Sequence, residues 1–293
     1  GSETKMIKIR ITADDFGYCK RRNLGILETI DNGSVNSVSI LMNGSDVIKL
    51  NKDVQKGLHV NLTEGTSTSE KSTVSTLLGP DQLFLGKFRF REKLCNGEIS
   101  KNELRIEIES QIEAFINKYL HIPTHVDGHQ HVHVLPLVRD LFAELLQKYS
   151  IKETRIPYEI GIVDCEWIEE PRLQFYKKVC EDALLAKKVF NDYGISFSDY
   201  FIGLTTMSRD FTEVHFMIAI KKIKEDLIKN KKILDNISIE VMVHPGYASE
   251  NNDGGCGGGP DSFSLSNDRD FEVNALTSKW FKKFLSSKHM NLL

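Results

Sequence analysis

Residues 7–15 read IKIRITADD, an alternating apolar stretch that ends in two adjacent carboxylates. Strict alternation has the period of a β-strand, so we expect a strand at residues 7–11 that ends at residues 12–15. A stretch with one apolar helical face follows at residues 23–31, and Asn32-Gly33 is a helix stop. This order of strand, polar turn and helix recurs along the chain, and the recurrence indicates the fold.

The remaining elements repeat the same order. Strands are expected at residues 38–42, 57–61, 125–126, 154–156 and 237–243, and helices at residues 102–119, 137–149, 175–190, 214–228 and 272–285. Residues 66–76 are rich in Ser and Thr and are expected to be irregular. No repeat or linker divides the chain, so βα units of this kind favour an α/β fold with a single domain over residues 6–293, either a parallel sheet or an irregular, TIM-barrel-like (β/α) barrel. Residues 1–5 are expected to be a tag remnant or a disordered N-terminus.

Composition narrows the class of protein. The 293 residues are 40% hydrophobic, which is enough for a sizeable core. A formal charge of -3 and a pI near 6.3 disfavour a nucleic-acid partner, because such proteins usually carry a basic excess. No apolar run approaches the roughly 20 residues of a membrane span, and the start of the chain lacks an apolar signal segment. Five scattered cysteines without CxxC spacing predict reduced thiols in a cytoplasmic protein with no membrane partner.

Two groups of polar residues lie in or after the first predicted strands, where β/α barrels collect catalytic side chains. Asp14 and Asp15 are neighbours with opposed directions, so one could bind a cation while the other accepts a proton. Taken alone, a solvated turn or a helix N-cap explains this pair better. His59 lies within the strand expected at residues 57–61, where a histidine is more often a packed core residue than a ligand.

The later part of the chain changes this balance. Residues 125–133 read HVDGHQHVH, with four histidines and one aspartate. Imidazole is a frequent metal ligand, and a carboxylate can orient it through the other ring nitrogen, so this segment favours a metal site over a surface histidine tract. His244 ends the strand expected at residues 237–243 and is well placed to act as an acid or base, although a core or capping role is the better explanation of His244 by itself.

A glycine-rich segment, GGCGGG, occupies residues 254–259. It lacks the Lys-Ser/Thr pair of a phosphate-binding loop and does not lead from a strand into a helix. We therefore expect a mobile loop near the site, a lid being one use, and not a nucleotide cradle.

Four motifs occur in one order along the chain. They are residues 12–17 (TADDFG), 57–65 (GLHVNLTEG), 124–133 (THVDGHQHVH) and 244–247 (HPGY). Together they resemble the YdjC-like carbohydrate deacetylases, the family of the bacterial chitooligosaccharide deacetylase. Residues 34–44 look like the second strand of that family, and residues 254–263 look most like its animal members. The resemblance extends from residue 7 to about residue 268.

The resemblance implies a deacetylase-type irregular β/α barrel that binds a divalent cation through one aspartate and two histidines. Asp15, His59 and His129 match the ligand positions. Spacing alone cannot separate His129 from His125, and the choice of His129 comes from the resemblance. Other members of the third motif are expected beside the ligands or against substrate: His125, Asp127, His131 and His133. Magnesium is the cation that the resemblance implies, whereas two imidazoles suit zinc or another transition metal better, so the metal stays open.

The resemblance also implies the reaction. It makes the chain a metal-dependent hydrolase that removes acetyl groups from N-acetylated amino sugars or oligosaccharides. The cation would polarise the acetyl carbonyl and activate a water, Asp14 would be the general base, and His244 would protonate the departing amine.

Two other functions compete with this one: a metal-dependent phosphoester or glycoside hydrolase, and a catalytically silent sugar-binding protein. The partner expected is a small molecule or oligosaccharide with an N-acetyl group. The oligomeric state stays open, a homodimer included.

Overall fold

The computed structural model describes residues 7–230, 236–250 and 253–287, so the expectation for residues 1–5 lies outside the described part. Six parallel strands form one curled sheet in the order β4-β3-β2-β1-β6-β5. The strands are β1 (Ile7–Phe16), β2 (Ser37–Ile40), β3 (Gln55–Val60), β4 (Val126–Gly128), β5 (Tyr200–Ile202) and β6 (Ile237–Val243).

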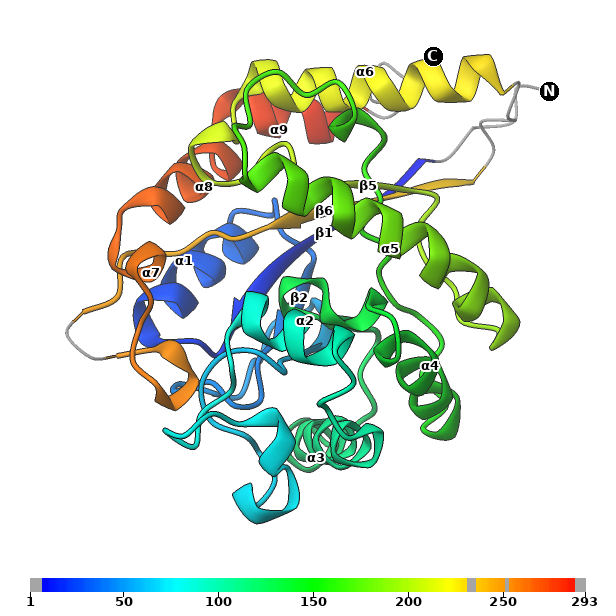
Figure 1. The fold of residues 1–293 in the computed structure, drawn as a ribbon. Coiled ribbons are helices and arrows are strands. Elements are labelled where there is room, and N and C mark those ends of the chain that lie inside the picture. Colours follow the sequence, from blue (N-terminus) through cyan, green and yellow to red (C-terminus); the bar gives the residue numbers. More distant parts are fainter. Residues whose placement is uncertain (1–6, 231–235, 251–252, 288–293) are drawn as a thin grey trace.

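Helices surround this sheet (Figure 1). They are α1 (Lys20–Asp31), α2 (Lys87–Cys95), α3 (Lys101–Tyr119), α4 (Val138–Lys148), α5 (Arg172–Asp192), α6 (Glu213–Lys229), α7 (Ser262–Leu265), α8 (Asp268–Leu276) and α9 (Lys279–Ser286). No helix of the described ranges has both the length and the apolarity needed to cross a bilayer.

The α/β class and the irregular barrel are confirmed. The two edges of the sheet are joined by two isolated parallel bridges, from Val126 to Thr154 and from Glu153 to Ser196, just before β5. The sheet therefore curls almost into a ring, with one weakly paired section where a complete strand would stand in a regular barrel.

Helix α3 illustrates how the sequence pattern produces the outer layer. Leu104, Ile108, Ile112 and Phe115 recur every three or four residues and are fully buried against the sheet. The Ser100 side chain caps the helix by accepting a hydrogen bond from the backbone amide of its first turn. Apolar periodicity and a cap agree here, and the helix predicted at residues 102–119 is confirmed.

Two expectations about elements were wrong, and three short elements were missed. Residues 154–156 make single bridges and no strand, and Pro157 has no amide hydrogen to extend a ladder there. The helix expected at residues 272–285 is two helices, because the Ser278 side chain caps a new one, α9. The short elements β5, α2 and α7 carry too little periodicity to be recognised.

The end of β1 departs from regular pairing. Ala13 pairs with Val38 and Phe16 with Ile40, so β1 has two residues in an interval where β2 has one. In this interval Asp15 has a φ of 71°. This is a β-bulge, which turns a side chain away from its regular direction. Asp14 and Asp15 consequently line the same cavity. The sequence had suggested instead that their side chains point in opposed directions.

Candidate metal centre

All five predicted site residues line one cavity of about 300 Å³ at the carboxyl ends of the strands: Asp14, Asp15, His59, His129 and His244. β1 carries the two aspartates, β3 carries His59, and the last two follow β4 and β6. Parallel strands of a barrel present their carboxyl ends at one rim, so residues far apart in sequence meet there.

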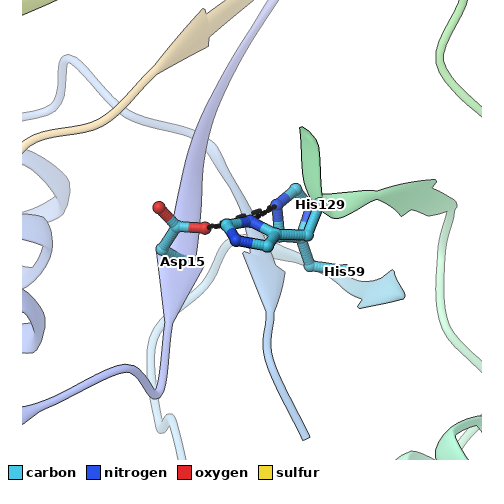
Figure 2. A group of neighbouring side chains, drawn as sticks. All are labelled: Asp15, His59 and His129. Carbon is cyan, nitrogen blue, oxygen red and sulfur yellow. Dashed lines mark hydrogen bonds and ion pairs between the residues drawn. The ribbon is translucent and has the colours of Figure 1, made fainter. Parts of the chain in front are cut away.

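Three of these residues form a compact group (Figure 2). Asp15 Oδ1 lies 3.3 Å from His59 Nε2 and 3.3 Å from His129 Nδ1. The two ring nitrogens are also 3.3 Å from each other. Ligands held about 2.1 Å from one ion have this mutual spacing, so the three atoms could bind one divalent cation.

Carboxylates fix the orientation of both imidazole rings. His59 Nδ1 donates to Asp127 Oδ1 at 2.6 Å, and His129 Nε2 donates to Glu64 Oε2 at 2.9 Å. A carboxylate only accepts, so the hydrogen of each ring lies on its outer nitrogen. In the neutral rings that a metal requires, the inner nitrogens would therefore direct their lone pairs toward Asp15, which is the usual arrangement around metal-binding histidines.

Asp15 is oriented in the same way. Arg22 and Arg269 both donate to its Oδ2 from 3.2 Å. The other oxygen, Oδ1, is buried and faces the inner nitrogens of His59 and His129 at 3.3 Å, with no further hydrogen-bond donor among the described residues. A buried carboxylate oxygen without a donor is costly, and a cation among the three donor atoms would satisfy it. The chemistry and geometry of the group therefore fit a metal ion.

The electrostatics of the ring nitrogens agree with this fit. Burial alone would lower the pKa of His59, but the carboxylates of Asp14, Asp127 and Asp15 outweigh it and raise the pKa to about 10. Burial would lower the pKa of His129 as well, but Asp15 and Glu64 outweigh it and raise the pKa to about 9. The pocket thus strongly attracts positive charge, and a metal ion would take the place of these protons.

Asp14 lines the same cavity but contacts different residues from those around Asp15. Arg155 donates to both of its oxygens at 2.8 Å. Burial would raise the pKa of Asp14, but Arg155 and then His59 outweigh it and hold the pKa well below its usual range. Asp14 Oδ2 lies 3.5 Å from His244 Nε2, and the backbone amide of His244 donates to Glu272. The aspartate is therefore ionised at neutral pH beside a histidine at the cavity wall.

A second group of three, Asp14, His59 and Asp127, has donor atoms close enough for a metal. Its carboxylates are engaged elsewhere, however: both oxygens of Asp14 accept from Arg155, and Asp127 Oδ1 accepts from both His59 and Ser39. The group that contains Asp15 is the better cation site, because Asp15 Oδ1 faces two ring nitrogens. Asp14 and Asp127 each already contact the positive charge of Arg155.

His125 stands outside both groups. Its ring packs where a Cβ on Gly57 would lie, and Nε2 is 3.5 Å from Asp127 Oδ2. His125 thus contacts the carboxylate that orients His59 and does not reach the group around Asp15. The position of the two rings therefore favours His129 over His125 as a ligand, a choice that spacing alone left open.

Several residues of the site escaped sequence analysis: Arg22, Glu64, Arg155, Arg269 and Glu272. Two of them carried a usable signal. Arg155 is a charged residue in the middle of a predicted apolar strand, and Glu64 lies inside the GLHVNLTEG motif. The others lie on helices at ordinary polar positions, so nothing in their pattern marks them.

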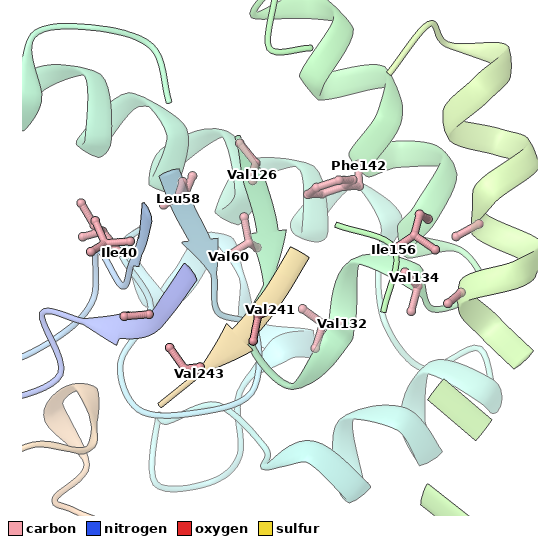
Figure 3. Close-up of a cluster of buried hydrophobic side chains, with 14 of the residues drawn as sticks. Ile40, Leu58, Val60, Val126, Val132, Val134, Phe142, Ile156, Val241 and Val243 are labelled. Atoms are coloured by element: carbon pink, nitrogen blue, oxygen red, sulfur yellow. The ribbon is translucent and has the colours of Figure 1, made fainter. Parts of the chain in front are cut away.

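His133 belongs to the apolar core, not to the cavity. Its ring packs against Phe142 and Phe190. Phe142 belongs to the apolar cluster drawn in Figure 3, which also contains Val132 and Val134. Nε2 donates to the backbone carbonyl of Arg155 at 2.7 Å. Burial lowers the pKa of His133 to about 4.

This burial predicts a pH-dependent stability. Between about pH 6.5 and pH 4 the unfolded chain binds a proton that folded His133 does not, so its contribution falls as the pH falls through that window. From pH 7 to pH 5, the free energy of unfolding of the wild type should drop by about 2 kcal/mol more than that of His133→Gln, which keeps a donor but cannot titrate. Urea unfolding of both proteins at several pH values measures the difference. Equal slopes would mean that His133 takes up its proton in the folded protein.

Comparison with known proteins agrees with this geometry. The family model for YdjC-like proteins matches residues 8–287. The chain belongs to the YdjC-like family. The motifs that suggested this resemblance are those that supply the candidate metal ligands Asp15, His59 and His129, together with Asp14 and His244.

Relatives within the YdjC-like family are named for their substrates. Carbohydrate deacetylases of Mus musculus and Homo sapiens are each 39% identical over 98% of this chain, which corresponds to 93% and 89% of those proteins. A chitooligosaccharide deacetylase of Yersinia pestis is 32% identical over 48% of this chain and 56% of its own length. The similarity to animal members extends over nearly the whole chain, as the residues near position 260 had suggested.

A solved structure supports the fold. A protein of Enterococcus faecalis described as a cellobiose-phosphate cleavage protein superimposes with a TM-score of 0.64, covering 98% of this chain and 96% of its own. The sequences are 18% identical. At that identity the likeness establishes the shared YdjC-like architecture and nothing further about chemistry.

Proposed function

We propose that this protein is a metal-dependent hydrolase that removes acetyl groups from N-acetylated amino sugars or oligosaccharides. One observation carries the proposal: Asp15, His59 and His129 direct three donor atoms to one point, and Asp14 and His244 face the same cavity. The animal and bacterial relatives named carbohydrate deacetylase support the choice of substrate.

Asp15, His59 and His129 would hold the cation. A bound divalent cation supplies Lewis-acid polarisation of the acetyl carbonyl and lowers the pKa of water. Two imidazoles and one carboxylate suit zinc or another transition metal better than magnesium, which prefers oxygen ligands. We therefore propose a transition metal as the native cation.

Asp14 would act as the general base. Arg155 keeps this carboxylate ionised, so Asp14 can accept a proton from the attacking water at neutral pH. His244, 3.5 Å from Asp14, would donate a proton to the nitrogen that leaves as an amine. The Glu272 carboxylate holds the His244 backbone in place through a hydrogen bond of 2.8 Å.

The decisive experiment pairs metal analysis of the purified protein with product analysis. We expect about one equivalent of metal and acetate release from a panel of N-acetylated mono- and oligosaccharides. Release of phosphate or of new reducing ends, with no acetate, would replace the proposal by one of the other hydrolase functions. Sugar binding without any product would replace it by a silent binding protein.

The ligand assignment has its own prediction. His129→Gln removes a donor of the metal group and should weaken metal binding by more than the ~10- to 100-fold that loss of an outer hydrogen-bond partner costs. The matched control is His125→Gln, which changes a buried histidine of the same motif that lies beside Gly57, Thr124 and Asp127 and belongs to neither candidate group. Both are measured by competition with a chromophoric chelator. Greater metal loss in the His125 variant would reverse the assignment.

A further inference from the structure

A second cavity, of about 520 Å³, adjoins the metal centre. The two cavities share four lining residues: Arg172, Met207, Ser208 and Phe263. The second extends the first outward along the insert that precedes α5 and the turn that follows β5. The inner cavity, at about 300 Å³, is at the small end of the range for ligand pockets, so any larger substrate must continue into the outer one.

Trp167 is a fixed aromatic wall of the outer cavity. Its ring stacks on His215, with centroids 3.9 Å apart and an interplanar angle of 5°. Its Nε1 donates to the backbone carbonyl of Thr205 at 2.8 Å. Stacking covers one face and the hydrogen bond fixes the plane, so the ring is held rigidly while its remaining surface is only partly buried.

The polar lining of the outer cavity is acidic on balance. Its two arginines are already paired, Arg172 with Asp210 at 3.0 Å and Arg209 with Asp268 at 2.8 Å. Glu169 and Glu170 add two exposed carboxylates. Four carboxylates against two paired guanidinium groups disfavour an anionic ligand and offer planar hydrogen-bonding groups to hydroxyl or amino groups.

We infer that the outer cavity is a subsite for the saccharide unit next to the one deacetylated, with its apolar face on Trp167. The inference rests on the proposed function. A pyranose ring has an apolar C–H face and a rim of hydroxyls, which match a fixed indole surface and the surrounding carboxylates and guanidinium groups. The unit that binds here is neutral or carries a free amino group. The protein is accordingly adapted to oligosaccharides, and a single amino sugar would use only the inner cavity.

The ratio of kcat/KM for a trisaccharide to kcat/KM for a monosaccharide tests the subsite. Trp167→Ala should lower kcat/KM for the tri-N-acetylated chitin trisaccharide about tenfold more than for N-acetylglucosamine, the loss being in KM. Trp167→Phe keeps a ring and should recover much of the preference. The matched control is Trp280→Phe, which alters the only other tryptophan, a residue that packs with Phe211 and Phe216 and does not line the cavity. This variant should keep the wild-type preference for the longer substrate.

Fluorescence tests binding without turnover. In the Trp280→Phe protein, Trp167 is the single tryptophan and reports directly on the subsite. The fully deacetylated trisaccharide of glucosamine should change its emission saturably, and glucosamine alone should do so only at concentrations about tenfold higher or more.

The outcomes separate the two proposals. A saturable fluorescence change with no acetate release from any substrate would remove the deacetylase function and leave the saccharide subsite standing. Acetate release with equal length preference in the wild type and Trp167→Ala, together with an unchanged emission, would overturn the subsite and leave the deacetylase.

Discussion

Asp14→Asn is expected to lower kcat by about a thousandfold while the protein keeps its full metal content, because removal of a general base typically costs 10²- to 10⁴-fold. The amide has the shape of the carboxylate but cannot accept the proton of the attacking water. The three atoms that would bind the cation belong to Asp15, His59 and His129 and are not altered. Initial rates of acetate release at saturating metal, with metal content measured on the same sample, test this.

Asp127→Asn is the matched control for a change near the cation. Asp127 orients His59 through a 2.6 Å hydrogen bond and has no role in proton transfer in the proposed reaction. Its loss should weaken metal binding ~10- to 100-fold, and excess metal should restore turnover. The Asp14 variant should stay inactive at any metal concentration. Wild-type turnover by Asp14→Asn, or its rescue by metal, would refute the assignment of Asp14 as the base.

The parts of the fold with a clear period could be predicted from the sequence. The alternation at residues 7–11, the apolar strand at 237–243 and the periodic face of α3 were each recognisable from their period, and the structure has β1, β6 and α3 at these places. Short elements could not be predicted. β5 has three residues, and its pairing with β6 is decided by the ring of strands around it, a tertiary cause that no local pattern records.

The site was predictable in its residue types and not in its geometry. Histidines and aspartates near strand ends indicated a metal, but the bulge that brings Asp14 and Asp15 to one cavity depends on how β1 pairs with β2. The pairing of Arg155 with carboxylates on β1, β4 and β6 is likewise a property of the way the sheet curls. Trp167 gave no signal, because a single tryptophan in an irregular insert has no period.

Arg155 is the residue whose loss should most affect the fold. It is fully buried and contacts three buried carboxylates: Asp14 at 2.8 Å, Asp127 at 3.2 Å and Glu240 at 2.9 Å. Arg155→Met would keep the volume and leave these three groups without their common counter-charge. Breaking a buried ion pair from one side typically costs 3–5 kcal/mol, so we expect a loss of about 5 kcal/mol from a total that for most domains is 5–15 kcal/mol.

The direction in which the free energy of unfolding changes with pH identifies why Arg155→Met loses stability. In the wild type, Arg155 holds the pKa of Asp14 and of Asp127 below the usual range, so these groups stabilise the fold above the pKa of the unfolded chain. Without Arg155, burial should raise both pKa values above those of the unfolded chain, and folding should then take up protons. The stability deficit of Arg155→Met should therefore be larger at pH 8 than at pH 5, as measured by urea unfolding of metal-free protein.

A double variant distinguishes lost charge balance from lost packing. Arg155→Met combined with Glu240→Gln removes one of the three carboxylates that Arg155 contacts, and this one would keep only Arg10, at 3.3 Å, as a cationic partner among the described residues. The double variant should therefore be more stable than the sum of the two single changes predicts, by about 1–3 kcal/mol. Arg155→Lys keeps the charge but lacks the planar guanidinium group, so its free energy of unfolding should lie between those of the wild type and of Arg155→Met. If the deficit of Arg155→Met is the same at pH 8 and pH 5 and the two changes are simply additive, then packing accounts for the loss and Arg155 is not what keeps Asp14 ionised.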